Sequence, residues 1–366
     1  MPRLLVLALI GAALFAQQKP QQKPSAQQME NLPPPIRVSV EEVVAPVLVF
    51  DQEGNYVNGL QPDQFRLFDN DKEQNIHVDV AYNPISLVIA IQANEHVQGL
   101  LPQVNRIGNL VAPLLIGNQG EAAVVAYDAR IRTLQDFTSD PDKITQAIKK
   151  IYPGSTSNRM VDAVVQGTRM LNTRPANRRR ILLLIGETRD MGSENRVREA
   201  LINLQLANVI FYSVDMSRFI TTLTAPPPVP RPNTNPPASV PLPSIVAATP
   251  NMVENTYGLD DRSANFLPLL LEIYRDAKAV FKANPVELFT KGTGGSEFGF
   301  HSQRTLEDAM QRIGDELHSQ YLISYVPNDK EEGGFHHITV EITGAPQVKR
   351  VQTRPGYWLA AKFEPK

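Results

Sequence analysis

The chain has 366 residues, no cysteine and a formal net charge of −2 at pH 7. Its length predicts about two domains, and its 42% of hydrophobic residues excludes a largely disordered chain. The near-neutral charge excludes the clustered basic surface of a nucleic-acid-binding protein, so we expect no nucleic-acid partner. The lack of cysteine excludes disulfides, a thiol nucleophile and a thiolate zinc site.

The first residues have the order of a secretory signal. Arg3 gives a positive start, residues 4–15 are apolar or small, and Ala16 ends the run. That run is too short to span a bilayer, which needs about 20 residues, and its order predicts a signal peptide over residues 1–16. Residues 17–35, rich in Gln and Pro, are expected to be a disordered leader. We therefore expect an exported protein, periplasmic or extracellular, with no transmembrane segment in the mature chain.

Residues 36–82 have the pattern of short antiparallel strands. Residues 47–50 form an apolar run, and residues 76–80 alternate with the period of a half-buried strand. Between them, Gly54 and the Asn58-Gly59 pair tolerate positive φ and predict turns. Residues 69–73 contain several acids, but they lack the glycine and the distal Glu of a calcium loop. We interpret them as a hairpin turn.

From residue 85 to residue 300 the pattern changes to alternating strands and helices. Apolar runs predict buried strands at residues 87–91, 122–127, 181–185 and 209–214, with an antiparallel hairpin partner at 131–137. Helical patterns occupy residues 92–115, 140–151, 161–171 and 193–206. This alternation predicts a doubly wound, mostly parallel sheet of the α/β class.

The second half of this region is interrupted by proline. Residues 225–243 carry proline at nearly every second position and are expected to form an exposed loop. A long helix is predicted at 265–289, a helix-to-strand turn at 292–295 and a short strand at 296–298. A helix over residues 303–318 follows, for which Thr305 is the predicted capping residue.

The tail, residues 320–358, again has strand patterns. It and residues 36–82 are each too small to bury a face alone, so we expect them to pair. The α/β domain would then be inserted between the two halves of a small β-sandwich, whose core Tyr357 and Trp358 would close. We interpret the neighbours His336 and His337 as a surface turn, and residues 178–180, three arginines, as a solvated loop.

Several segments together resemble a von Willebrand factor A domain, and more narrowly the A-domain-related proteins abundant in Acidobacteria. The resemblance covers residues 37–357, and its carriers are residues 47–54, 59–60, 63–65, 87–91, 161–164, 182–190, 292–295, 320–322 and 354–357. It implies a doubly wound sheet and a role in binding proteins or other macromolecules.

The resemblance also implies a metal-ion-dependent adhesion site at the carboxyl edge of the sheet, where ligands of open α/β sheets bind. Its oxygen ligands come from an Asp-x-Ser-x-Ser turn, a Thr and a later Asp. The corresponding positions here depart from that pattern: Gln92, Asn94, His96, Asn158 and Glu187, with Asp190 three residues further on. One carboxylate and several amides hold Mg²⁺ poorly, so we expect no metal and no other cofactor. The alternatives are a family-type Mg²⁺ or Ca²⁺ site and another cation arrangement that uses Glu95, Glu187 or Asp190.

The sequence contains no nucleophile elbow, phosphate loop or zinc-protease helix, so we expect no enzyme. The main hypothesis is an exported module that binds a protein or cell-envelope partner through residues 92–96, 155–159 and 187–193. One alternative is a hydrolase built from His96, Glu187 and Asp190; another is a structural envelope component. The proline-rich loop is interpreted as a flexible insertion, with a docking segment as the alternative.

Overall fold

The computed structural model describes residues 42–79, 83–217, 284–300, 302–328 and 334–359. The predicted signal peptide, the leader, the proline-rich loop and most of the predicted helix at 265–289 lie outside the described residues. Among the described residues, no helix has both the length and the apolar character needed to cross a membrane.

The centre of the fold is a six-stranded sheet in the order β10-β9-β8-β5-β6-β7. Five strands are parallel, and β7 pairs antiparallel with β6 at one edge. Every residue of β5 is buried because both faces of the sheet are covered. The strands are β5 (Ile85–Gln92), β6 (Glu121–Tyr127), β7 (Ile131–Thr138), β8 (Arg179–Gly186), β9 (Val209–Asp215) and β10 (Glu297–Gly299).

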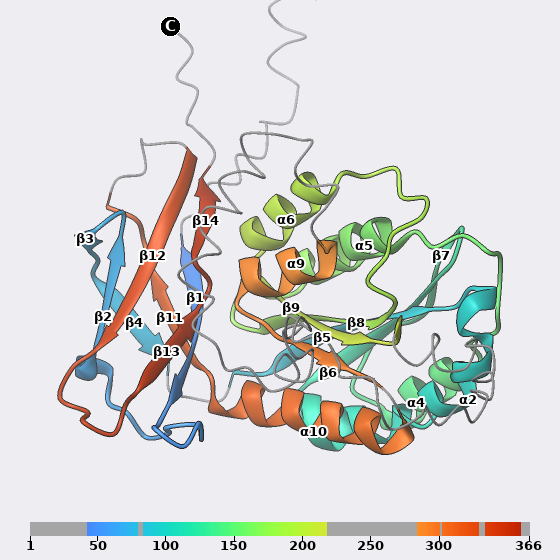
Figure 1. The fold of residues 1–366 in the computed structure, drawn as a ribbon, viewed down its shortest axis with the longest axis horizontal. Coiled ribbons are helices and arrows are strands. Elements are labelled where there is room, and N and C mark those ends of the chain that lie inside the picture. Colours follow the sequence, from blue (N-terminus) through green and yellow to red (C-terminus); the bar gives the residue numbers. More distant parts are fainter. Residues whose placement is uncertain (1–41, 80–82, 218–283, 301, 329–333, 360–366) are drawn as a thin grey trace, which may run out of the picture. The chain divides into compact units, whose positions relative to one another are not determined.

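Helices cover both faces of this sheet (Figure 1). One apolar core lies between the sheet and α5, α6 and α9; a second lies between the sheet and α2, α3, α4 and α10. The amphipathic patterns of these helices therefore face the sheet, as their sequences predict. The helices are α2 (Leu101–Val104), α3 (Gly108–Val111), α4 (Pro141–Lys149), α5 (Met160–Asn172), α6 (Val197–Leu206), α9 (Pro285–Thr293) and α10 (Gln303–Ser319).

The two terminal segments pair with each other in a β-sandwich. One sheet has the order β13-β1-β11-β4 and the other the order β14-β12-β2-β3, so each mixes strands from before and after the α/β domain. The fold class predicted from the sequence is confirmed: an α/β domain with a mostly parallel sheet is inserted between two halves of a sandwich. The strands are β1 (Val43–Phe50), β2 (Phe65–Asp69), β3 (Lys72–Glu73), β4 (Ile76–Asp79), β11 (Tyr321–Tyr325), β12 (Gly334–Ile342), β13 (Arg350–Thr353) and β14 (Gly356–Leu359).

Three helix predictions were wrong in detail. The helix predicted at 92–115 is broken into short helical pieces, with Pro102 and Pro113 near the starts of two of them. Helix α6 begins at Val197 rather than at residue 193. The N-cap of α10 is Ser302, whose hydroxyl accepts from the Thr305 backbone N–H, so Thr305 is the third helical residue and not the cap.

Two predictions of exposed polar residues were also wrong. Arg179 is buried in β8 and donates to the Leu317 carbonyl and to Gln320 Oε1, both at 2.5 Å. His336 lies in β12, is buried, and its Nδ1 is 2.9 Å from Asp69 Oδ1. In each case a partner far away in the sequence satisfies the buried polar group.

The prediction that both Tyr357 and Trp358 close the sandwich core holds for only one of them. Tyr357 is buried in the sandwich core, as expected. Trp358 is only partly buried, and the guanidinium of Arg198 lies 5.6 Å from its ring centroid. The tryptophan therefore contributes to the contact between β14 and α6.

Candidate functional site

The candidate site is the carboxyl edge of the six-stranded sheet, which we call the rim. It consists of residues 92–96 at the end of β5 and just after it, residues 128–130 after β6, residues 152–159 between α4 and α5, and residues 187–196 between β8 and α6. Parallel strands end together at this edge, so their loops meet there. The rim contains all six positions that the sequence analysis selected.

Gln92 is the central residue of the rim and is fully buried. Its Nε2 donates to Asn94 Oδ1 at 3.0 Å and to Glu187 Oε2 at 2.7 Å, while its Oε1 accepts from the Glu187 backbone N–H at 2.7 Å. A Cβ at Gly186 would lie 2.8 Å from Gln92 Oε1, so glycine permits this close approach. The Gln92 amide therefore joins the loops after β5 and β8.

Asn94 and His96 lie on either side of this bridge. Asn94 is buried, and its Nδ2 lies 3.4 Å from the Thr156 carbonyl, in the loop between α4 and α5. His96 is about half-exposed, and its Nδ1 is 3.9 Å from Glu187 Oε2. Glu187 thus accepts a short hydrogen bond from Gln92, whereas its contact with His96 is longer than a hydrogen bond.

Asn158 and Asp190 hold neighbouring backbone segments. Asn158 is buried and donates from Nδ2 to the Arg189 carbonyl at 2.7 Å. Asp190 Oδ1 accepts from the Val161 N–H at 3.1 Å and from Ser193 Oγ at 2.7 Å. Asp190 therefore binds the first turn of α5, where a carboxylate is favoured by the helix dipole, and does not point toward Gln92 and Glu187 as one shared ligand set.

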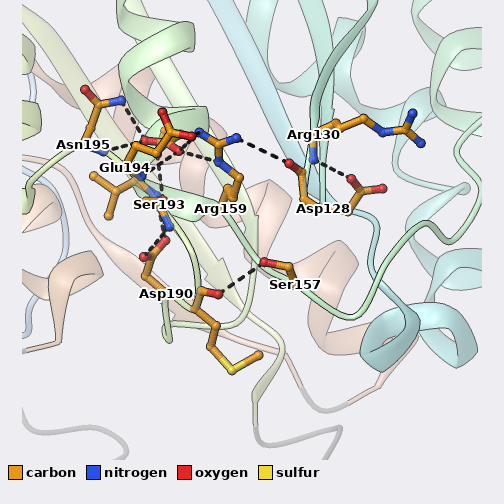
Figure 2. A network of polar contacts seen from close by, with 12 residues as sticks. Asp128, Arg130, Ser157, Arg159, Asp190, Ser193, Glu194 and Asn195 are labelled. Atoms are coloured by element: carbon orange, nitrogen blue, oxygen red, sulfur yellow. Dashed lines mark hydrogen bonds and ion pairs between the residues drawn. The ribbon is translucent and has the colours of Figure 1, made fainter.

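Sequence reasoning missed Asp162, which organises the loop before α6; Figure 2 shows its partners Arg159, Glu194 and Asn195. Its Oδ1 accepts from the Asn195 backbone N–H at 2.9 Å, and its Oδ2 accepts from the Glu194 N–H at 3.0 Å and from Arg159 Nε at 2.6 Å. Burial opposes the charged form, but these hydrogen bonds together hold the pKa of Asp162 below its ordinary value. An acid within the apolar pattern of the predicted helix at 161–171 was the available signal.

Asp128, directly after β6, was also missed. It is buried, accepts from the Arg130 N–H at 2.7 Å, and forms an ion pair of 3.4 Å with Arg132. A Cβ at Gly154 would lie only 1.6 Å from Asp128 Oδ2, so the loop between α4 and α5 packs directly on this carboxylate. Its position at the end of a predicted buried strand was a signal that sequence reasoning did not use.

These residues do not fit a bound magnesium ion. Both N–H groups of the Gln92 amide point at the oxygens of Asn94 and Glu187 that would have to coordinate it. Glu187 is the single carboxylate bonded to Gln92, since Asp190 is bonded to Val161 and Ser193, whereas hard cations bind sites with several anionic oxygens. Among the described residues, no group of three or more His, Asp and Glu side chains is arranged to hold a metal ion.

The strand order defines the class of the domain. Read from β7, the sheet has the doubly wound order 3-2-1-4-5-6, with the third strand antiparallel at the edge. The α/β domain therefore has the doubly wound sheet that the resemblance to a von Willebrand factor A domain implies.

Comparisons with known proteins give matches only among solved structures. No family model matches the chain, and no curated protein matches it. BatB of Bacteroides thetaiotaomicron is 14% identical with a TM-score of 0.30, over 36% of this chain and 66% of that one. The vWF domain of the type V pili tip protein Mfa5 of Porphyromonas gingivalis is 18% identical with a TM-score of 0.25, over 29% and 38%. An aerotolerance-related membrane protein of Bacteroides fragilis is 11% identical with a TM-score of 0.37, over 63% and 99%.

Replacing Asp162 with alanine is expected to loosen residues 193–195 and to lower the free energy of unfolding by about 2 to 3 kcal/mol. The substitution leaves the N–H groups of Glu194 and Asn195 without their acceptor. Hydrogen exchange of these amides, together with urea denaturation, measures both effects. Glu194→Ala, which removes an exposed carboxylate from the same loop, is the control. Unchanged protection of residues 193–195 in Asp162→Ala would contradict the assignment.

Proposed function

We propose that this chain is an exported binding module that contacts a protein or cell-envelope partner through the rim, without a bridging metal ion. The observation that carries the proposal is the Gln92 amide, which holds the loops after β5 and β8 together by hydrogen bonds alone. A surface ordered in this way loses little conformational entropy on binding.

The proposal includes a degenerate adhesion site and no enzymatic activity. The absence of activity is supported by the contacts of the three residues that the alternative hydrolase would need: His96 Nδ1 is 3.9 Å from Glu187 Oε2, beyond hydrogen-bond distance, and Asp190 is bonded to Val161 and Ser193. A general base must lie within hydrogen-bond reach of the group it activates. The exported location is supported by the order of residues 1–16.

A magnesium titration by calorimetry tests the metal-free part of the proposal. The wild-type chain is expected to give no saturable heat, because the Gln92 amide hydrogens point at the oxygens that would bind the ion. Gln92→Asp is the positive comparison, since it removes the amide and adds a second carboxylate, and it is expected to bind Mg²⁺ more tightly than wild type. Saturable binding by the wild type that Glu187→Ala abolishes would overturn the proposal.

The binding role itself is tested by affinity capture from the native envelope. The whole chain is compared with a Tyr152→Ala, Met191→Ala variant, which trims two exposed rim side chains and leaves the hydrogen-bonded rim residues in place. Partners that wild type captures and this variant loses would support the rim as the contact surface. Partners that both capture equally would place the contact elsewhere.

A further inference from the structure

Three aspartates in and beside the rim are bound to neighbouring backbone N–H groups. Asp128, Asp162 and Asp190 all accept hydrogen bonds from backbone N–H groups of the rim or of α5. Asp128 and Asp162 are in addition paired with arginines, Arg132 and Arg159. These three carboxylates are therefore used to hold the loops together and are poorly placed to meet a partner.

The rim also contains three exposed arginines, Arg130, Arg189 and Arg196. None of the three forms an ion pair with a described residue, and Arg130 and Arg189 lie in the loops that directly follow β6 and β8. Figure 2 shows Arg130 extending away from the hydrogen-bonded network while its backbone N–H stays bound to Asp128. The exposed acids of the rim are Glu95 and Glu194, and Glu194 is paired with Arg159 at 3.0 Å.

Two exposed apolar side chains belong to the loops of the rim. Tyr152 is 57% exposed and Met191 is 37% exposed, and among the described residues only one other large hydrophobic side chain, Val326, is exposed. The Arg132 guanidinium lies 4.4 Å from the Tyr152 ring centroid, which orders the ring. Met191 is held by its N–H, which donates to the Asn158 carbonyl at 2.9 Å. Tyr, Met and Arg are the residue types enriched in protein interfaces.

We propose that the partner is a protein and that it presents an acidic segment in which carboxylates flank an apolar side chain. This inference rests on the proposed function. Arg130 and Arg189 bind the carboxylates, and Tyr152 and Met191 contact the apolar side chain. Arginine suits this task because its planar guanidinium binds a carboxylate through two parallel hydrogen bonds. In this chain, guanidinium groups take the place of a metal ion as the positive element of the surface.

Selection from a displayed library of random short peptides on the immobilised whole chain tests the inference. The selected peptides are expected to be enriched in Asp and Glu next to an aromatic or aliphatic residue. A double variant that carries both Arg130→Gln and Arg189→Gln should bind the best peptide with an affinity lower by about tenfold or more. Arg169→Gln, Lys349→Gln is the matched control, because it removes two exposed charges outside the rim, and it should leave the affinity unchanged.

The outcomes separate the inference from the proposed function. Peptides without acidic enrichment that lose binding in Tyr152→Ala, Met191→Ala overturn the acidic partner and leave the binding role intact. If the affinity of the selected peptides is unchanged in every rim variant, or if no peptide is enriched, both the inference and the proposed function are contradicted. Binding of phosphatidylglycerol vesicles that depends on Arg130 and Arg189, without selection of acidic peptides, overturns the inference in favour of an anionic lipid surface.

Discussion

Replacing Asp69 with alanine is expected to lower the free energy of unfolding by about 3 to 5 kcal/mol, because it breaks a buried polar cluster in the sandwich core. Asp69 accepts from the hydroxyls of Tyr325 at 3.0 Å and Tyr357 at 2.8 Å, and its other oxygen is 2.9 Å from His336 Nδ1. Arg354 is buried beside them; burial lowers its pKa to about 10, an effect that the two tyrosines and Asp69 oppose.

The size of the effect follows from what the substitution leaves behind. Removing the carboxylate takes away an acceptor that two buried tyrosine hydroxyls and the His336 ring share, and the negative charge beside the buried Arg354 guanidinium, and such losses inside a core are costly. The cluster also connects strands from both halves of the sandwich, since Asp69 ends β2 while its partners lie in β11, β12 and β14. Loss of the cluster should therefore destabilise the pairing of the N-terminal and C-terminal segments.

Chemical denaturation at neutral pH measures this effect. Tyr325→Phe, which removes one of the hydroxyl donors, should cost only about 1 kcal/mol and remains measurable if Asp69→Ala fails to fold. Glu341→Ala, which removes an exposed carboxylate from β12, is the control and should change little. A loss in Asp69→Ala no larger than that in the control would show that the cluster does not stabilise the core.

Glu316→Gln is expected to raise the stability of the protein at pH 8 and to flatten its pH dependence. Glu316 is buried near the end of α10, where Ser296 Oγ donates to its Oε2 at 2.8 Å. Burial raises the pKa of Glu316 to about 7, partly offset by Ser296, Tyr212 and Arg350. Tyr56 also faces this carboxyl group; its own pKa is raised, by burial first and then by Glu316.

The sign of this pH dependence follows from the raised pKa of Glu316. The folded state holds the Glu316 proton more tightly than the unfolded chain, whose carboxyl group has the ordinary value of 4.5. The stabilisation is therefore complete below about pH 4.5 and is lost as the pH rises through about 7. The largest contribution that such a shift allows is about 3 kcal/mol. Glutamine resembles the protonated acid in shape and cannot lose a proton. The substitution therefore removes the contribution of Glu316 to the pH dependence of stability.

Urea denaturation of wild type and variant between pH 5 and 8 tests this prediction. The difference in the free energy of unfolding should grow with pH in favour of Glu316→Gln. Asp315→Asn is the matched control, because Asp315 is the exposed neighbour on the same turn and its loss removes the same charge. Parallel pH profiles for wild type and Glu316→Gln would contradict the assignment.

The elements that a single stretch of residues can specify were predicted well. The strand at residues 181–185 is uniformly apolar, and in β8 each of these side chains is fully buried. The hairpin turn after residue 69 was predicted from its Asp and Asn residues, and Asn70 and Asp71 do adopt positive φ. The helix predicted from Asp140 and Pro141 begins there, with Asp140 accepting from the N–H groups of the first turn. In each case the physical cause lies within a few neighbouring residues.

Which polar side chains are buried was decided only by the tertiary structure. Arg179 was expected in solvent and is buried because Leu317 and Gln320, some 140 residues away, accept its hydrogen bonds. His336 is buried for the same reason, since Asp69 lies 267 residues away in the sequence. A local pattern cannot show whether a polar side chain will find such a partner, and without one its burial would be prohibitive.

The rim shows the same division. The sequence by itself selected the positions Gln92 and Glu187, and their residue types predicted an altered adhesion site. Only the tertiary structure brought them within 2.7 Å and turned Asp128 and Asp162 inward to hold the loops. The strand order that joins these loops places residues 95 positions apart in direct contact, and a hydrogen bond between them depends on that geometry rather than on any local pattern.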